Sequence, residues 1–335
     1  MKIGGFDIKK NVLLIAEIGN NHEGNLDAAE ELIYKAAKSG ANAVKFQSID
    51  PYKLVSPKEK NRIKQLKKFQ ISYKDHFRLK KVADKNKVIF LSTPFSIEAV
   101  EFLDSLVPAY KIASSDNNYF KLIECVAKKK KPIFLSTGMT NMKEISFTVK
   151  KIKEVSKKIK KNPELVLLQC VSSYPTKEQF ANLATIKTLS SLGFTVGYSD
   201  HTIGIEAAVL SVGLGARVIE KHFTLSKNYS EFRDHKLSAE PEEFKELAER
   251  VKNANLLLGN GEKKIQECEK STFKVARRSI CVAIDMKKGD KLSAENLICL
   301  RPGNGIPPGT EKKIVGKRLL KNLKAGEQIK TSILE

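Results

Sequence analysis

The 335-residue chain is poor in cysteine and in long apolar runs, and both shortages narrow the class of protein. No run of ~18 apolar residues is present, so no transmembrane helix is expected. The first residues, Met1–Gly5, lack the apolar core of a signal peptide, and we expect a cytoplasmic protein with no membrane partner. The cysteines are odd in number and show no C-x-x-C spacing, which predicts reduced thiols and argues against a disulfide framework or a zinc site. They are Cys125, Cys170, Cys268, Cys281 and Cys299.

Arginine is scarce as well, although the net charge of the chain is +22. Of the 60 basic residues, nine are Arg and 51 are Lys. Recognition of bases and phosphates in nucleic acids favours the guanidinium fork of Arg. The lysines lie instead in separate runs such as 128–131 and 157–161, which are typical of exposed helix faces and loops. This pattern predicts no nucleic-acid partner, and it is compatible with a small anionic substrate.

Short β-type runs alternate with longer amphipathic stretches over the first 260 or so residues. Eight strand–helix repeats in this length predict an α/β fold of the (β/α)₈ TIM-barrel type. A doubly wound open sheet is the alternative, but no G-x-G-x-x-G follows any strand. The predicted strands are Leu13–Ile18, Ala43–Phe46, Val88–Ser92, Tyr110–Ala113, Ile133–Ser136, Leu165–Val171, Thr195–Ser199 and Val218–Phe223.

The residue pattern changes after Gly261, where a charged connector leads to short, β-like and turn-rich segments. Two of these segments, "DMKKGDKLSAENL" and "NLKAGEQIKTSIL", resemble each other, and the loop "RPGNGIPPG" lies between them. We therefore predict a barrel domain over residues 1–262, a linker over 263–276 and a small β-rich domain over 277–335.

Histidine is also rare, yet two of the five histidines end successive predicted strands. His201 follows the apolar run at 196–198, and His222 follows the apolar run at 218–219. Active sites of (β/α)₈ barrels lie at the C-terminal ends of the strands, and neighbouring strands are about 4.8 Å apart. A single histidine in such a place is usually a hydrogen-bonded core residue. Two in register on adjacent strands predict a site for a divalent cation, with positions left open for substrate.

Polar residues end the other strands too, and two buried lysines are the most informative of them. Lys45 and Lys111, together with the hydroxyls of Ser114, Ser136 and Ser199, predict a cradle for a phosphate and a carboxylate. No Walker-type loop is present, so a nucleotide is not expected. A Schiff-base aldolase is the mechanistic alternative, because a lysine on a barrel strand can attack a carbonyl. The paired histidines argue against it, since a Schiff-base enzyme needs no metal.

The motifs in their order along the chain resemble the sialic acid (N-acetylneuraminate) synthase family. The turn-rich C-terminal segment resembles the antifreeze-like (SAF) domain of the same family. The resemblance spans essentially the whole chain. It is carried by "IAEIGNNHEG", "VKFQ", "LSTPF", "YKIASSDNN", "LSTGM", "YPT", "SDHT", "IEKHF", "DHKLSAEP" and "RPGNG".

This resemblance implies a transferase that condenses phosphoenolpyruvate (PEP) with an N-acylated hexosamine of the N-acetylmannosamine type, giving N-acetylneuraminate and phosphate. It implies that His201 and His222 bind the metal, Mn²⁺ in the first place and Mg²⁺ or Co²⁺ as alternatives, and that Glu17 and Glu220 handle protons. The implied PEP-binding residues are Lys45, Lys111, Ser114, Ser136, Ser172 and Ser199. The implied acceptor-binding residues are Gln47, Asp116, Tyr174, Asp234 and Arg301.

Arg301 matches an arginine that the family delivers from one subunit into the barrel of its partner, which implies a domain-swapped homodimer. The chain also departs from the family pattern. Asp116 stands where many members have a longer Glu, Ser172 replaces an Asn, and "NYSEFR" precedes Asp234 in place of a Gly/Pro-rich loop. The acceptor therefore stays open. N-acetylneuraminate formation is expected, and the alternative is a legionaminic or pseudaminic acid synthase that uses a 6-deoxy diacetamido hexose.

Overall fold

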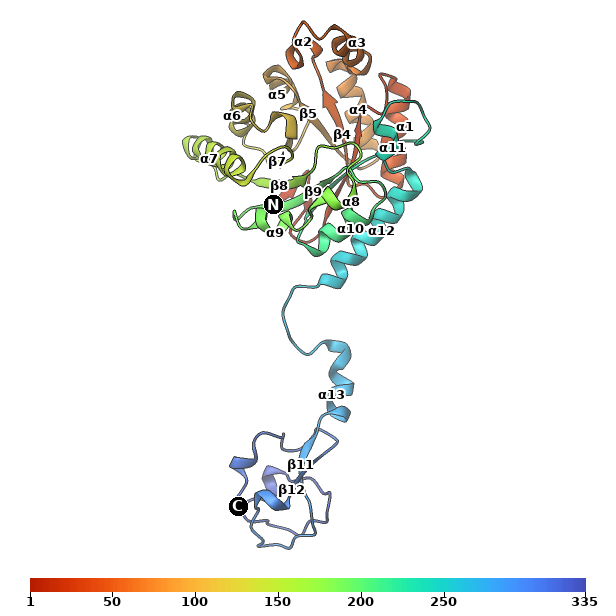
Figure 1. Cartoon of the computed structure of the whole chain (residues 1–335). Coiled ribbons are helices and arrows are strands. Elements are labelled where there is room, and N and C mark those ends of the chain that lie inside the picture. The colour runs from red at the N-terminus through yellow and green to blue at the C-terminus, as the bar shows by residue number, and fades with distance from the viewer. The chain divides into compact units, whose positions relative to one another are not determined.

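The computed structural model describes all residues from Met1 to Glu335 and divides into two compact units, Met1–Gly259 and Asn260–Glu335. In the first unit, helices surround a central set of strands (Figure 1). None of the helices combines the length and the apolar character that a membrane crossing requires.

The strands of the first unit form a nearly closed parallel barrel, which confirms the predicted fold class. Hydrogen bonds connect them in the order β5-β4-β3-β10-β9-β8-β7-β6, and β5 and β6 lie side by side at the seam. Each predicted strand is present, and no end is shifted by more than two residues. The strands are β3 (Leu13–Gly19), β4 (Ala43–Ser48), β5 (Ile89–Pro94), β6 (Tyr110–Ile112), β7 (Ile133–Ser136), β8 (Leu165–Cys170), β9 (Thr195–Asp200) and β10 (Val218–His222).

Several helices begin where the local sequence provides a cap. Asn141 and Glu144 form a capping box at the start of α7, and Pro241 opens α12, which ends at Leu258 with Gly259 as its C-cap. The helices are α1 (Leu26–Lys38), α2 (Pro51–Leu54), α3 (Lys60–Phe69), α4 (Tyr73–Lys85), α5 (Ile97–Leu103), α6 (Phe120–Lys128), α7 (Met142–Lys158), α8 (Glu178–Ala181), α9 (Thr185–Ser190), α10 (Glu206–Gly213), α11 (Asp234–Leu237) and α12 (Pro241–Leu258).

The alternation of side chains along each strand separates two apolar layers from the polar end of the barrel. Leu14, Ala16 and Ile18 face the helices in the outer layer, whereas Leu13 and Ile15 belong to a second cluster inside the barrel. A short N-terminal hairpin of β1 (Lys2–Ile3) and β2 (Phe6–Asp7) adds to this inner cluster. The N-terminal half of the barrel is therefore filled. Residues two positions further along, such as Glu17, continue the inward face at the C-terminal end.

The second unit has its own small core. Strands β11 (Ser279–Val282) and β12 (Leu297–Leu300) pair in antiparallel fashion, and the two similar segments meet where Met286 and Leu323 exchange backbone hydrogen bonds of 2.8 and 2.9 Å. The segment predicted as a linker contains the 3₁₀ turn η2 (Glu267–Glu269) and the helix α13 (Lys270–Ala276). The core of the unit comprises Ile280, Val282, Met286, Leu292, Ile314, Leu319, Leu323 and Ile329.

Candidate active site

A polar cavity of about 840 Å³ lies at the C-terminal end of the barrel, above the apolar cluster that fills the inside. This is the end at which barrel enzymes place their active sites. Strand alternation brings most of the predicted site residues into this one cavity. Those that line it are Glu17, Lys45, Gln47, Lys111, Ser114, Ser136, Ser172, Tyr174, Ser199, His201, Glu220, His222 and Asp234.

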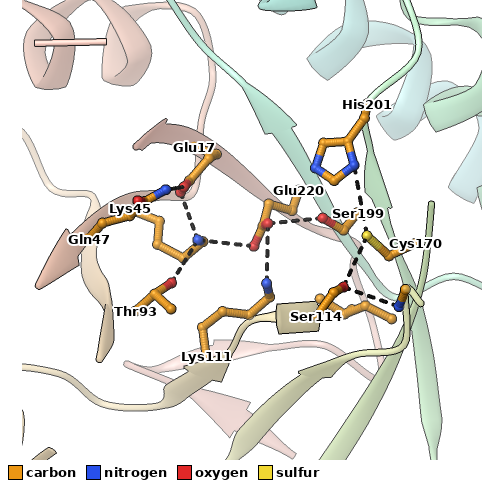
Figure 2. A network of polar contacts seen from close by, with 12 residues as sticks. Glu17, Lys45, Gln47, Thr93, Lys111, Ser114, Cys170, Ser199, His201 and Glu220 are labelled. Atoms are coloured by element: carbon orange, nitrogen blue, oxygen red, sulfur yellow. Dashed lines mark hydrogen bonds and ion pairs between the residues drawn. The ribbon is translucent and has the colours of Figure 1, made fainter. Parts of the chain in front are cut away.

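Two lysines and two glutamates form a buried ion-pair network in the cavity (Figure 2). Lys45 Nζ lies 2.8 Å from Glu17 Oε2 and 3.6 Å from Glu220 Oε2, while Lys111 Nζ lies 3.4 Å from Glu220 Oε1. Lys45 also donates a 3.0 Å hydrogen bond to Thr93. Charges this deeply buried are costly unless they are paired. The network meets that requirement and keeps both cations available at the cavity wall.

The two carboxyls of the network have opposite pKa shifts. Burial raises the pKa of Glu17 above its usual value, and Lys45 only partly opposes this. Burial acts on Glu220 in the same direction, but Lys111 and Lys45 outweigh it and lower the pKa to about 2. Glu220 is thus ionised, and Glu17 is the carboxyl that is closer to accepting a proton. A pair of carboxyls with divided pKa values is typical of acid–base chemistry.

The hydroxyls of Ser114 and Ser172 lie close to Gly138, in the wall of the cavity that Lys111 also lines. The backbone N–H of Gly138 donates to Ser114 Oγ at 3.1 Å, and a Cβ at position 138 would lie only 2.5 Å from Ser172 Oγ. The hydroxyls of Ser136 and Ser172 are buried and have no hydrogen-bond partner. Buried hydroxyls are rarely left unsatisfied, so these two point to a ligand that supplies acceptors. Beside a lysine, that ligand is an anion.

His201 and His222 lie next to each other, with ring centroids 5.4 Å apart. His201 Nδ1 lies 2.8 Å from the carbonyl oxygen of Val171, so this nitrogen carries the hydrogen and Nε2 is left as an acceptor. Burial and the neighbouring His201 hold the pKa of His222 well below its usual value, and its Nδ1 is buried without a partner. The two imidazoles therefore present free nitrogens close together.

This arrangement fits the predicted divalent cation. The lowered pKa keeps His222 neutral, the form that binds metal, and the Val171 carbonyl orients the ring of His201 as outer-sphere groups do at metal sites. Contacts with Cys170 and Val171 outweigh burial and raise the pKa of His201. No cluster of three or more His, Cys, Asp or Glu side chains suitable for a metal is present, so these two imidazoles would hold the cation by themselves, with its other positions open. An open coordination shell is what a catalytic site requires, in contrast to a structural one.

A loop before α11 forms the outer wall of the cavity. His235 anchors it from beneath, since its ring lies 2.6 Å from Thr224 Oγ1 and 3.0 Å from Glu23 Oε1. Asp234 lines the cavity and accepts a 3.2 Å hydrogen bond from Arg233, whose guanidinium lies 5.1 Å from the Tyr174 ring. The loop thus holds a carboxylate, a cation and an aromatic face together at the cavity mouth.

The same wall is partly apolar. Phe69 of α3 and Phe232 of the loop both line the cavity, and their rings are 4.9 Å apart. Leu54, Leu66 and Phe95 extend this surface. Such a wall accommodates methyl groups and leaves hydroxyls without partners.

Two predicted site residues lie elsewhere. Asp116 ends the 3₁₀ turn η1 (Ser114–Asp116) and does not line the cavity; its Oδ2 is buried without a partner. Its contact with the acceptor stays a prediction. Arg301 belongs to the second unit, where it lines a surface depression with Val275 and Pro302.

We predict that Asp116→Asn stabilises the protein at pH 7.5 and not at pH 4. Burial raises the pKa of Asp116 to about 6, so the folded state disfavours the ionised form. The unfolded chain ionises near pH 4, and the penalty therefore grows between pH 4 and pH 6 and persists above that range. Because the group is partly exposed, we expect about 1 kcal/mol, measured as the difference in free energy of unfolding between variant and wild type. An equal difference at both pH values would contradict this.

Sequence reasoning missed three contributors to the cavity. Arg233 and Arg62 line it, and neither was predicted to be a site residue. Cys170 lies 3.5 Å from Ser114 Oγ and 3.8 Å from His201 Nδ1, as Figure 2 shows. For Cys170 a signal was present, since it occupies an inward position on β8 two residues after Leu168 of the inner cluster. The sequence carries no such signal for the two arginines, because a side chain on a loop or helix has no fixed direction toward the barrel axis.

Comparison with known proteins now identifies the class. Residues 32–263 match the model of the NeuB family, and residues 277–335 match that of the SAF domain. The chain belongs to the NeuB family and carries a C-terminal SAF domain, which confirms the resemblance drawn from its motifs.

Its relatives and structural neighbours include proteins named as legionaminic, pseudaminic and sialic acid synthases. The N,N'-diacetyllegionaminic acid synthase of Legionella pneumophila is 40% identical, covering 93% of this chain and 92% of that protein. The pseudaminic acid synthase of Campylobacter jejuni is 38% identical and covers 98% of both. The crystal structure of N-acetylneuraminic acid (sialic acid) synthetase from Leptospira borgpetersenii, in complex with citrate, matches with a TM-score of 0.73 at 35% identity, covering 78% of this chain and 90% of that one.

Proposed function

We propose that this chain condenses PEP with the open aldehyde form of an N-acylated hexosamine, giving a nine-carbon 2-keto acid and phosphate. The observation that carries the proposal is the pair of unpartnered buried hydroxyls, Ser136 and Ser172, which line the same cavity as Lys111. Such a cradle suits the phosphate of PEP, and Lys45, at the opposite side of Glu220, suits a carboxylate. Membership of the NeuB family supports the same reading.

The reaction joins the methylene carbon of PEP to the aldehyde carbon of the acceptor. Water then adds to the former enol carbon, and the C–O bond to phosphate breaks, which leaves the 2-keto group. In this scheme the two lysines hold the anionic groups in place and Glu17, the carboxyl with the raised pKa, transfers the proton. His201 and His222 would hold a divalent cation, Mn²⁺ by our expectation, which supplies Lewis-acid polarisation of the aldehyde when bound.

For the acceptor, the apolar wall of Leu54, Leu66, Phe69, Phe95 and Phe232 favours a 6-deoxy diacetamido hexose over N-acetylmannosamine. A methyl at C6 and the methyl of a second acetamido group can pack there. Hydroxyls at the same places would lose their hydrogen bonds to water. The relatives named as legionaminic and pseudaminic acid synthases support this choice.

The deciding experiment is an assay of phosphate release from PEP with each acceptor in turn. We expect kcat/KM to be at least about 10-fold higher for the 6-deoxy diacetamido sugar, since one added or missing group in an apolar pocket changes discrimination by roughly this factor. A preference for N-acetylmannosamine would overturn the acceptor assignment alone. Failure to release phosphate with either sugar would overturn the synthase proposal.

The Schiff-base alternative is tested with pyruvate and borohydride. Glu17 and Glu220 outweigh burial and raise the pKa of Lys45, so this amine stays protonated. Burial lowers the pKa of Lys111, so Lys111 is the more suitable of the two amines to form a Schiff base. Covalent trapping on Lys111 would support an aldolase, and its absence supports the PEP mechanism.

A test of the proposed domain-swapped homodimer uses Arg301. We expect Arg301→Ala to raise the KM for acceptor far more than the KM for PEP. If the arginine serves the partner's barrel, mixing Arg301→Ala with His222→Ala restores activity, because each mixed dimer contains one site with both residues. The expected recovery after subunit exchange is about one quarter of the wild-type rate at low acceptor concentration. Absence of recovery despite exchange would mean that Arg301 acts within its own chain or not at all.

A further inference from the structure

A second buried ion pair lies directly behind the two histidines and takes no part in the proposed chemistry. Asp200 and Lys221 are adjacent residues of β9 and β10, and their side chains are 0% and 1% exposed. Lys221 Nζ lies 2.9 Å from Asp200 Oδ2. Because neighbouring residues of a strand point to opposite faces, this pair lies outside the barrel wall while His201 and His222 point inside.

The pair fixes the backbone on both sides of His201. Asp200 Oδ1 accepts hydrogen bonds of 2.8 Å from both the N–H and the hydroxyl of Thr202. Lys221 Nζ donates to the Thr202 carbonyl at 2.5 Å. All three polar groups of Thr202 are therefore held by the pair. His201 lies between Asp200 and Thr202, so its Cα has little freedom to move.

The same contacts connect the strand of one histidine to that of the other. Lys221 directly precedes His222, and its ammonium reaches across to the residue that follows His201. Strand β10 thus cannot shift along β9 without breaking the ion pair and the bond to Thr202. The relative positions of the two imidazoles depend on these contacts.

The energetics indicate a geometric role. Desolvation of two charges offsets most of their attraction, so a buried ion pair contributes little net stability compared with apolar residues of the same size. A pair that adds little stability but joins two neighbouring strands at one point specifies their alignment. Its position behind both free imidazoles places that specificity at the cation site.

We propose that Asp200 and Lys221 are positioning residues that set the separation of the His201 and His222 rings and thereby the affinity of this site for a divalent cation. The inference rests on the proposed cation site of these histidines. It adds two residues that touch neither substrate nor cation. Groups behind metal-binding histidines act through orientation, and their loss typically weakens metal binding about 10- to 100-fold.

The test is a titration of full-length, EDTA-stripped protein with Mn²⁺, followed by the electron paramagnetic resonance signal of the free ion. Asp200→Asn keeps the shape of the pair, and the double variant Asp200→Asn/Lys221→Met removes both charges so that neither is left buried alone. We expect both variants to stay folded and to bind Mn²⁺ about 10- to 100-fold more weakly than wild type. Excess Mn²⁺ should restore most of their turnover.

Gln169→Met provides the matched control. Gln169 is buried on the neighbouring strand β8 and donates a 3.0 Å hydrogen bond to the Ala181 carbonyl, so its replacement removes a buried polar contact of similar kind. We expect this variant to lose thermal stability and to bind Mn²⁺ as wild type does. Unchanged Mn²⁺ affinity in both Asp200 variants, with wild type binding normally, would overturn the positioning role. Absence of Mn²⁺ binding by wild type would instead overturn the cation site itself.

Discussion

Replacement of His222 with alanine is expected to abolish turnover while the barrel stays folded. The imidazole is one of only two side chains that we assign to the cation, and the Lewis-acid contribution of a catalytic cation amounts to several kcal/mol. Loss of that contribution corresponds to a fall in kcat of about 1000-fold or more. Treatment with EDTA should have the same effect and be reversed by Mn²⁺. The measurements are phosphate release and the melting temperature.

His76→Gln is the control for this experiment. His76 is fully buried, bonds Ser48 at 2.7 Å and lies outside the cavity lining. Its loss should lower the melting temperature and leave Mn²⁺ dependence unchanged, the reverse of the His222 result. Full activity of His222→Ala, or activity that persists in EDTA, would remove the cation from the mechanism.

Gly138→Ala is expected to prevent productive binding of PEP. The added methyl would lie 2.5 Å from Ser172 Oγ and 2.8 Å from Ser114 Oγ, so it displaces the hydroxyls beside which we place the phosphate. Loss of two charge-assisted hydrogen bonds corresponds to about 3 kcal/mol, or a rise in the KM for PEP of roughly 100-fold. The KM for acceptor should change much less, because the apolar wall and Asp234 are untouched.

The control for this variant is Gly213→Ala on α10, where an added Cβ meets nothing within 4 Å. This substitution should leave both KM values unchanged and slightly favour the helix. If Gly138→Ala binds PEP normally, the phosphate lies elsewhere in the cavity and the hydroxyl cradle has another ligand.

The barrel and its lining could be predicted because both depend on simple periodicity. Inward positions such as Glu17, Lys45 and Glu220 follow apolar residues at a spacing of two, so their direction was fixed once the strand was recognised. Asp116 shows the limit of this reasoning. It belongs to a 3₁₀ turn after the strand, where no period determines which way a side chain points.

The contacts between loops could not be predicted from the sequence either. Arg233 approaches Tyr174 only because His235 anchors its loop to Glu23, a residue more than two hundred positions earlier in the chain. A local pattern carries no information about such a pairing. The sequence did indicate that the loop before Asp234 is unusual, since "NYSEFR" departs from the Gly/Pro-rich loop of the family.

The apolar cluster beneath the cavity restricts how ligands enter and leave the barrel. Leu13, Ile15 and Phe134 close the lower half of the barrel, so no second exit exists at that end. A ligand bound at the bottom of the cavity can leave only after any ligand bound above it has dissociated. Under the proposed function, substrates and products pass through the same opening of the cavity, and the rate of that passage sets an upper limit on turnover.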